Sequence, residues 1–147
     1  MSKTEETLRL EREIWAFTRR LGLFGCFEVT IGWHGRERVD YMTYDTKGIW
    51  RCYEIKVSKA DFHSKAKNTF VGHFNYYVMP KALYEQVKDE IPKGIGVYAG
   101  GEIVKKPTHR SLKVSEKVLM NSMIRSLYRE FEKSYRTKKR HSTSEWD

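Results

Sequence analysis

The sequence predicts an α/β fold in which helices pack on the faces of a mixed β-sheet. Three observations predict it: apolar residues recur at helical spacing near both ends of the chain, β-branched and aromatic runs occupy residues 27–57, and a further helical segment precedes an almost continuous apolar run at residues 74–79. The chain has 147 residues, enough to bury one core without disulfides or a structural metal. We therefore expect a single domain over residues 1–136 and a basic, flexible tail over residues 137–147.

The first predicted element is a helix over residues 4–21. Thr4 is a suitable N-cap, because its hydroxyl can accept a hydrogen bond from the first turn, and Gly22 is a suitable end, because glycine readily leaves the helical conformation. The apolar face of this helix is formed by Leu10, Ile14, Phe17 and Leu21.

Three strands should follow as an antiparallel meander. The segments 27–33, 38–48 and 49–57 are rich in β-branched and aromatic residues, as strands are. Turn-like residues separate them, HGRE at 34–37 and DTKG at 45–48. Short turns of this kind join neighbouring strands into hairpins.

The rest of the chain alternates helices and strands. Ser58 can cap a short amphipathic helix, and Pro80 ends an apolar run whose composition is typical of a strand buried on both faces. The expected elements are a helix at 58–68, a strand at 74–79, a helix at 81–90, one or two short strands within 95–106, and a helix at 115–136.

The composition is basic. The formal net charge is +9, from 28 Lys and Arg against 19 Asp and Glu, and the pI is near 9.5. This excess favours a polyanionic partner, nucleic acid first and anionic membrane second; a basic protein without such a partner is the alternative. Cys26 and Cys52 lie in apolar runs, which predicts core residues in a reducing compartment. No apolar run approaches the roughly 18 residues that cross a bilayer, so we expect a cytoplasmic protein without a membrane partner.

Two charged residues, Glu54 and Lys56, interrupt the apolar strand at 49–57. Side chains alternate along a strand, so both point to one face while Ile55 points to the core. A hairpin turning near residues 45–48 brings Asp40 close to Glu54. Two carboxylates about 4 to 5 Å apart repel by roughly 3 to 4 kcal/mol at an effective dielectric near 20, so a compensating cation is expected.

Lys56 offsets part of this repulsion, and a divalent cation would offset more. Carboxylate oxygens on adjacent strands suit Mg²⁺ or Mn²⁺, which lower the pKa of bound water and stabilise charge on a phosphate oxygen. Lys56 could then orient the nucleophile or neutralise the transition state. These residue types together indicate a phosphodiester hydrolase. The alternative is a solvent-facing polar stripe, because E-x-K alone is a common tripeptide.

The order helix, D-x(13)-E-x-K on a hairpin, helix and strand resembles the PD-(D/E)xK nuclease superfamily. More narrowly, residues 28–80 are similar to the MmcB-like DNA repair proteins. The shared features are an R-x-D strand, an E-[IV]-K strand, the S-x-x-D-F start of a helix, and a strand that ends here in YYVMP. The rest of the chain matches only in the order of its elements.

The resemblance implies a restriction-endonuclease-like core in which a helix, the three-stranded meander, and a further helix and strand form a mixed sheet flanked by helices, with a C-terminal helix added. It also implies that Asp40, Glu54 and Lys56 are the catalytic residues, and that the two acids and the backbone of Ile55 bind the metal. Val39 stands where the superfamily motif has proline, a position that varies widely in such folds.

Other charged residues are candidates to complete the site. The superfamily often supplies a further acid from its first helix or strand, for which Glu28 is our first candidate and Glu13 the second; each could instead be an ordinary surface acid. Arg38 shares the face of Asp40 and could hold a carboxylate or a phosphate, or be a solvated residue beside a turn. The other candidates for binding the DNA backbone, or for a solvated surface, are Lys59, Lys65, Lys67, Lys138, Lys139 and Arg140.

The predicted function is a Mg²⁺- or Mn²⁺-dependent nuclease that acts on DNA in repair, recombination or phage DNA processing. The small size of the chain favours recognition of DNA structure rather than sequence. RNA is an alternative substrate to DNA. One alternative function is a catalytically inactive DNA-binding module of the same fold, and another is a basic scaffold that binds a protein through aromatic residues. Many enzymes of the superfamily are dimers, so the resemblance also suggests a homodimer, for which the C-terminal helix could serve as an interface.

Overall fold

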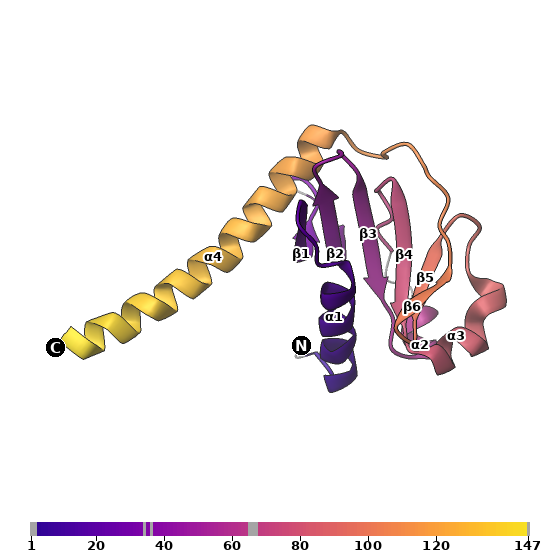
Figure 1. Ribbon diagram of the computed structural model, residues 1–147, viewed down its shortest axis with the longest axis horizontal. Coiled ribbons are helices and arrows are strands. Elements are labelled where there is room, and N and C mark those ends of the chain that lie inside the picture. The colour runs from indigo at the N-terminus through magenta and orange to yellow at the C-terminus, as the bar shows by residue number, and fades with distance from the viewer. Residues whose placement is uncertain (1–2, 34, 36, 65–67, 147) are drawn as a thin grey trace.

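The computed structural model describes residues 3–33, 35, 37–64 and 68–146. Its centre is a six-stranded mixed sheet in which the strands lie side by side in chain order (Figure 1). The first three strands and the last pair are antiparallel, whereas β3, β4 and β5 run parallel to one another. The strands are β1 (Leu23–Thr30), β2 (Arg38–Asp45), β3 (Trp50–Ile55), β4 (Phe74–Met79), β5 (Gly96–Ala99) and β6 (Glu102–Lys105).

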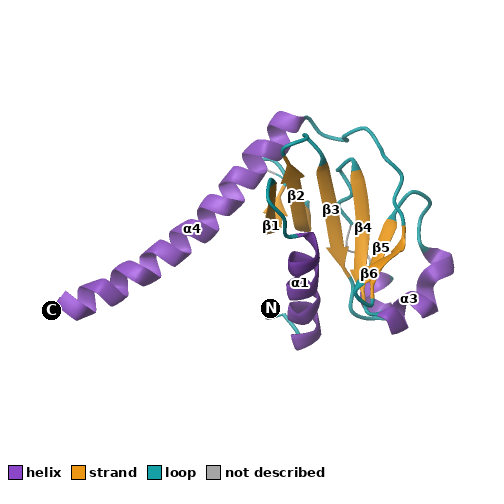
Figure 2. Cartoon of the chain, in the orientation of Figure 1, coloured by secondary structure: helices purple, strands orange, loops and turns teal. Residues whose placement is uncertain are grey.

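Helices cover both faces of this sheet, which confirms the predicted α/β class (Figure 2). They are α1 (Glu5–Thr18), α2 (Lys59–Phe62), α3 (Lys81–Val87) with the 3-10 turn η1 (Lys88–Glu90), and α4 (Glu116–Trp146). On one face, Leu10 and Ile14 of α1 pack against Tyr41, Tyr53 and Val78. On the other, α3 packs on the β4 and β5 end of the sheet, and α4 packs on the β1 and β2 end.

Helix α1 begins at the predicted N-cap but ends three residues before the predicted end. The hydroxyl of Thr4 accepts a hydrogen bond from the N–H of Thr7 at 3.1 Å. At the other end the hydroxyl of Thr18 bonds back to the carbonyl of Ile14 at 2.8 Å, and the chain then leaves the helix. The predicted boundary at residue 21 is therefore wrong, and Leu21 is fully exposed instead of forming part of the core.

Two other helices differ in length from the prediction. Ser58 caps α2 as expected, but α2 is a single turn that ends at Phe62 instead of extending to residue 68. Helix α4 continues to Trp146, so the predicted helix end at residue 136 is wrong. Residues 116–146 contain no glycine or proline, so nothing in the sequence interrupts the backbone hydrogen bonds of this helix. Among the described residues, no helix is long and apolar enough to cross a membrane.

The hairpin between β2 and β3 turns where the sequence predicted. Asp45 accepts hydrogen bonds from the N–H groups of Lys47 and Ile49 at 2.9 and 3.2 Å, and Gly48 adopts a left-handed φ of 80°. Asp45 also pairs with Arg51 at 3.0 Å. This turn sets the register of β2 against β3 and thus the position of the charged residues along both strands.

Candidate functional site

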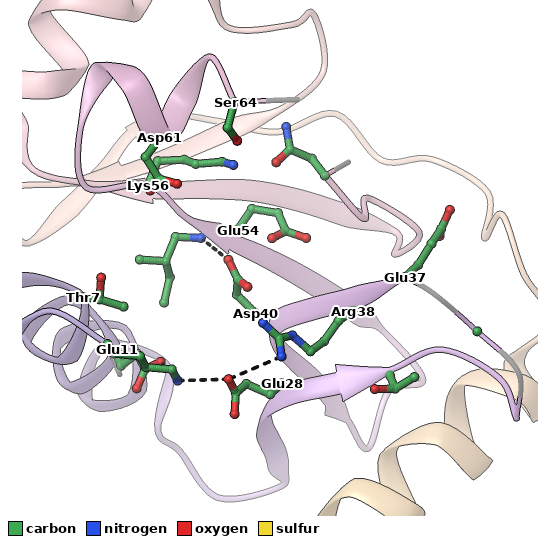
Figure 3. A pocket seen from close by; sticks show the side chains of 15 residues that line it. Thr7, Glu11, Glu28, Glu37, Arg38, Asp40, Glu54, Lys56, Asp61 and Ser64 are labelled. Carbon is green, nitrogen blue, oxygen red and sulfur yellow. Dashed lines mark hydrogen bonds and ion pairs between the residues drawn. The ribbon is translucent and has the colours of Figure 1, made fainter. Parts of the chain in front are cut away.

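Three carboxylates lie abreast on the first three strands. Between β1 and β2, Phe27 pairs with Tyr41 and Val29 with Val39, so Glu28 and Asp40 occupy the intervening positions. Between β2 and β3, Tyr41 pairs with Tyr53, and the next position in the same register places Asp40 opposite Glu54. The structure therefore brings Asp40 and Glu54 together, as expected for this hairpin, and adds Glu28 to the row (Figure 3).

Glu54 is a buried acid in an unfavourable environment for a negative charge. Only 4% of its surface is exposed, and Oε1 accepts a hydrogen bond from the N–H of Thr69 at 2.9 Å. Burial, followed by the charge of Asp40, raises the pKa of Glu54 to about 9. The Thr69 N–H and the charge of Lys56 act in the opposite direction but do not outweigh burial.

Asp40 and Lys56 complete the centre of the site. Oδ2 of Asp40 accepts a hydrogen bond from the N–H of Ile55 at 2.8 Å. Ile55 lies beyond the residues of β3 that pair with β2, so the side chain of Asp40 provides an acceptor for this backbone N–H group. Lys56 is 6% exposed, and its backbone N–H donates to the carbonyl of Val78 at 2.9 Å. Glu54 and Lys56 thus form a buried polar site rather than a solvent-facing stripe.

These residues line a cleft of about 860 Å³ (Figure 3). Its charged lining consists of six carboxylates and three bases, a formal charge of −3 in a chain whose net charge is +9. Besides the row of three, the acids are Glu11, Glu37 and Asp61, and the bases are Lys3, Arg38 and Lys56.

Glu28 holds an unusual backbone conformation at the edge of this cleft. Its φ is 54°, the one left-handed non-glycine residue in the described part of the chain, and its carbonyl accepts a hydrogen bond from Nη2 of Arg129 on α4 at 3.2 Å. Its carboxylate lies 3.5 Å from Nζ of Lys3 and 3.7 Å from Nη1 of Arg38. Glu13, the other candidate acid, is outside the cleft lining and forms an ion pair with Arg9.

The predicted DNA-binding residues are not gathered in one place. Arg38 lines the cleft, as predicted for a residue that shares the face of Asp40. Lys59 is exposed at the start of α2 and is not part of the lining, and Lys138 is exposed on the part of α4 that projects away from the sheet (Figure 1). Lys65, Lys67 and the side chains of Lys139 and Arg140 lie outside the described residues.

Several lining residues were not singled out from the sequence. Glu11 follows the buried Leu10 on α1, whereas the analysis of the sequence chose Glu13 on the same helix. The sequence does indicate a structural role for Asp61, because it completes the S-x-x-D pattern that is typical of a capped helix. Its N–H donates to Oγ of Ser58 at 3.1 Å, and its Oδ2 accepts from the N–H of Val57 at 3.0 Å.

The donor set for a metal consists of oxygen atoms. In the part of the chain that the structure describes, no group of three or more His, Cys, Asp or Glu side chains is arranged to hold a metal ion. Asp40 and Glu54 nevertheless supply two adjacent carboxylates, and Mg²⁺ commonly takes one or two protein carboxylates and completes its shell with water and phosphate oxygens. The site fits a hard cation of this kind.

Comparison with known proteins supports the fold but not a family. No protein-family model and no curated protein matches the chain. A solved structure, described as a protein of unknown function from Silicibacter pomeroyi, matches with a TM-score of 0.69 over 93% of this chain and 94% of that one. The two sequences are 18% identical, so this likeness shows a shared fold.

Proposed function

We propose that the protein is a metal-dependent nuclease of the PD-(D/E)xK type, most similar to the MmcB-like proteins, that hydrolyses phosphodiester bonds in DNA in a structure-guided manner. The observation that carries the proposal is the pair formed by Asp40 and Glu54, two carboxyl groups on adjacent strands that line one cleft with the buried Lys56. Holding two acids in this arrangement is unfavourable unless a cation or a proton lies between them.

The charge of the cleft supports the requirement for a cation. A phosphodiester is an anion, and the acids of the lining outnumber its bases even when Glu54 is protonated, so without a cation the lining would repel the substrate. A divalent cation held by Asp40 and Glu54 would reverse the sign of the potential at the centre of the cleft. The positive charge of the rest of the chain then favours approach of DNA to the molecule.

Each residue has a distinct part in this chemistry. A bound Mg²⁺ or Mn²⁺ would lower the pKa of water and stabilise charge on the phosphate oxygens. Asp40 and Glu54 would hold it, and the N–H groups of Ile55 and Thr69 fix the orientation of the two carboxyl groups. Lys56, which is buried and directly follows β3, would orient the attacking water or neutralise charge that develops on the phosphate.

Arg38 and Glu28 form the outer part of the site. The guanidinium of Arg38 is 3.7 Å from Glu28 and is more than half exposed. An arginine in this position could exchange its carboxylate partner for a phosphate of the substrate, because both accept hydrogen bonds in the same bidentate geometry.

A cleavage assay tests the proposal. Plasmid and branched DNA would be incubated with Mg²⁺ or Mn²⁺ and the parent protein, Glu54→Ala or Lys56→Ala. Matched controls are Glu85→Ala and Lys88→Ala, which remove the same side chains from an exposed ion pair between α3 and η1. We expect cleavage by the parent and the controls only. Unchanged cleavage by both site variants would refute the site, and DNA binding without cleavage by the parent would instead indicate a non-catalytic module.

A further inference from the structure

Helix α4 has two apolar faces, and its own domain covers only one of them. The packed face carries Leu119, Ser122, Met123 and Ser126, which are buried, and Leu119 and Met123 belong to the core with residues of β1 and β2. The second face, which we call the outer stripe, consists of residues that are 40% to 59% exposed: Ile124, Leu127, Tyr128, Phe131 and Tyr135.

The outer stripe points away from the sheet. With 3.6 residues in each turn, its centre lies roughly 145° around the helix from the packed face, so the domain that covers one face cannot reach the other. Figure 1 shows that α4 also runs outward from the sheet along its length. The stripe is continuous, because the ring of Phe131 lies 6.2 Å from that of Tyr128 and 6.0 Å from that of Tyr135.

The packed face becomes charged where the helix leaves the sheet. Arg129 still bonds to β1 through the carbonyl of Glu28, but Glu130 and Lys133, which follow on that side of the helix, pair with each other. Beyond this point the outer stripe holds the apolar residues available for packing. Because most of the stability of a protein helix comes from packing of an apolar face, a partner that covers the stripe would stabilise the projecting part.

We infer that the outer stripe is the interface of a homodimer in which α4 of a second copy packs antiparallel against it. The stripe is aliphatic at its start, with Ile124 and Leu127, and aromatic at its end, with Phe131 and Tyr135. An antiparallel pair with its two-fold axis at Tyr128 places the aliphatic part of each helix on the aromatic part of the other. The stripe is therefore complementary to itself, as a two-fold interface requires.

The area available matches a reversible dimer. Aromatic side chains bury roughly 150 to 250 Å² each when covered, and more than half of each of the three stripe aromatics is exposed. With the two aliphatic residues, each copy offers on the order of 450 Å², or about 900 Å² for the pair, near the lower limit of about 1,000 Å² for a specific interface. This inference does not depend on the nuclease proposal.

Sedimentation velocity on the full chain tests the dimer. Over about 1 to 100 µM the parent should shift from one 17.5 kDa chain toward two. Phe131→Ser should weaken association by at least about tenfold, because a central aromatic residue usually dominates a small interface. Lys133→Ser changes an exposed residue on another side of α4 and should leave the association unchanged. A parent that stays monomeric, or a Phe131→Ser variant that associates like the parent, would overturn the inference.

Cysteine cross-linking tests the antiparallel arrangement. Tyr128→Cys places its thiols at the two-fold axis and should form a disulfide-linked dimer under mild oxidation, whereas the buried Cys26 and Cys52 of the parent should not. Tyr135→Cys should not cross-link, because seven residues from the axis on each helix separate the two sites by about 20 Å, and a disulfide needs Cα atoms within about 7 Å. Cross-linking of Tyr135→Cys as readily as Tyr128→Cys would show a parallel pair and overturn the arrangement.

Discussion

Asp40 and Glu54 face each other across β2 and β3, and the charge of Asp40 adds to burial in raising the pKa of Glu54. Burial is the largest cause of this shift, so the carboxyl group of Glu54 keeps its proton far above the usual pKa of a glutamate. The N–H of Ile55 holds Asp40 and the N–H of Thr69 holds Glu54, so neither acid can turn away without losing a bond. A divalent cation bound by this pair would therefore have to displace the proton of Glu54.

Glu54→Gln should be more stable than the parent at about pH 8 in the presence of a chelator, by a few degrees in Tm. The pKa of Glu54 is raised from 4.5 to about 9, so the folded state holds a proton that the unfolded state has lost. Between these values the stability of the parent therefore falls as the pH rises, and glutamine, which does not ionise, removes this loss.

Thermal unfolding followed by circular dichroism at about pH 5 and pH 8 measures this difference. The two proteins should converge toward the lower pH. The exposed Glu85 provides the control, since Glu85→Gln should leave the pH dependence unchanged. A Glu54→Gln variant with the same pH dependence as the parent would show that Glu54 is ionised in the folded protein.

Asp40→Ala and Asp40→Asn should separate the structural role of Asp40 from its charge. Alanine leaves the N–H of the buried Ile55 without its acceptor, which should lower the free energy of unfolding by about 1 to 3 kcal/mol, whereas asparagine can still accept this bond. Both substitutions remove the carboxylate and should abolish DNA cleavage. Urea unfolding and the cleavage assay measure the two effects, and full activity of Asp40→Asn would exclude Asp40 as a metal ligand.

Glu28→Gly should be more stable than Glu28→Ala by about 1 kcal/mol, because a left-handed φ of 54° disfavours any residue with a Cβ. At Glu85 within α3 the order should reverse, since glycine in a helix is less stable than alanine by about 0.5 to 1 kcal/mol. Urea unfolding of the four variants measures both differences. The same order at both positions would show that Glu28 is not strained.

Much of the fold follows from local patterns in the sequence. Thr4 and Ser58 mark helix starts, the DTKG turn marks a hairpin, and this hairpin is enough to place Asp40 beside Glu54. The carbonyl of Glu28, a residue with a left-handed φ of 54°, accepts a hydrogen bond from Arg129, 101 positions away in the chain, and no local pattern could indicate this contact. The same is true of Lys3 and Glu11, which reach the cleft only because α1 packs beside the sheet.

The ends of α1 and α4 could not be predicted from the spacing of apolar residues alone. The apolar spacing through Phe17 and Leu21 continues past the end of α1, but the hydroxyl of Thr18 competes for the helical carbonyls, and tertiary contacts then take the chain into β1. In α4 the apolar spacing fades after Tyr135 although the helix continues, because a run without breakers can stay helical without an apolar face.

Cys26 and Cys52 should not react with a thiol reagent in the folded protein. Both are buried, and burial raises the pKa of Cys26 to about 11 and that of Cys52 to about 12, so neither forms a thiolate near neutral pH. Colorimetric titration with an aromatic disulfide reagent should detect two thiols in each chain after unfolding and none before. Rapid reaction of either thiol in the folded protein would show that its surroundings open readily.

Mn²⁺ should stabilise the parent more strongly at about pH 8.5 than at about pH 6, because the cation must displace the proton held by Glu54. The change in Tm on adding Mn²⁺ at each pH measures this linkage. Glu54→Gln and Asp40→Asn should lose most of the effect, and Glu85→Gln should keep it. Equal stabilisation of all four proteins would place the bound cation elsewhere.

A crystal structure of the parent soaked with Mn²⁺ and recorded near the manganese absorption edge tests the central proposal most directly. We expect an anomalous difference peak between the carboxylates of Asp40 and Glu54, in the cleft that also contains Lys56. A map from a fully soaked crystal with no peak at this position, or with peaks only elsewhere on the molecule, would contradict a metal site formed by these two residues.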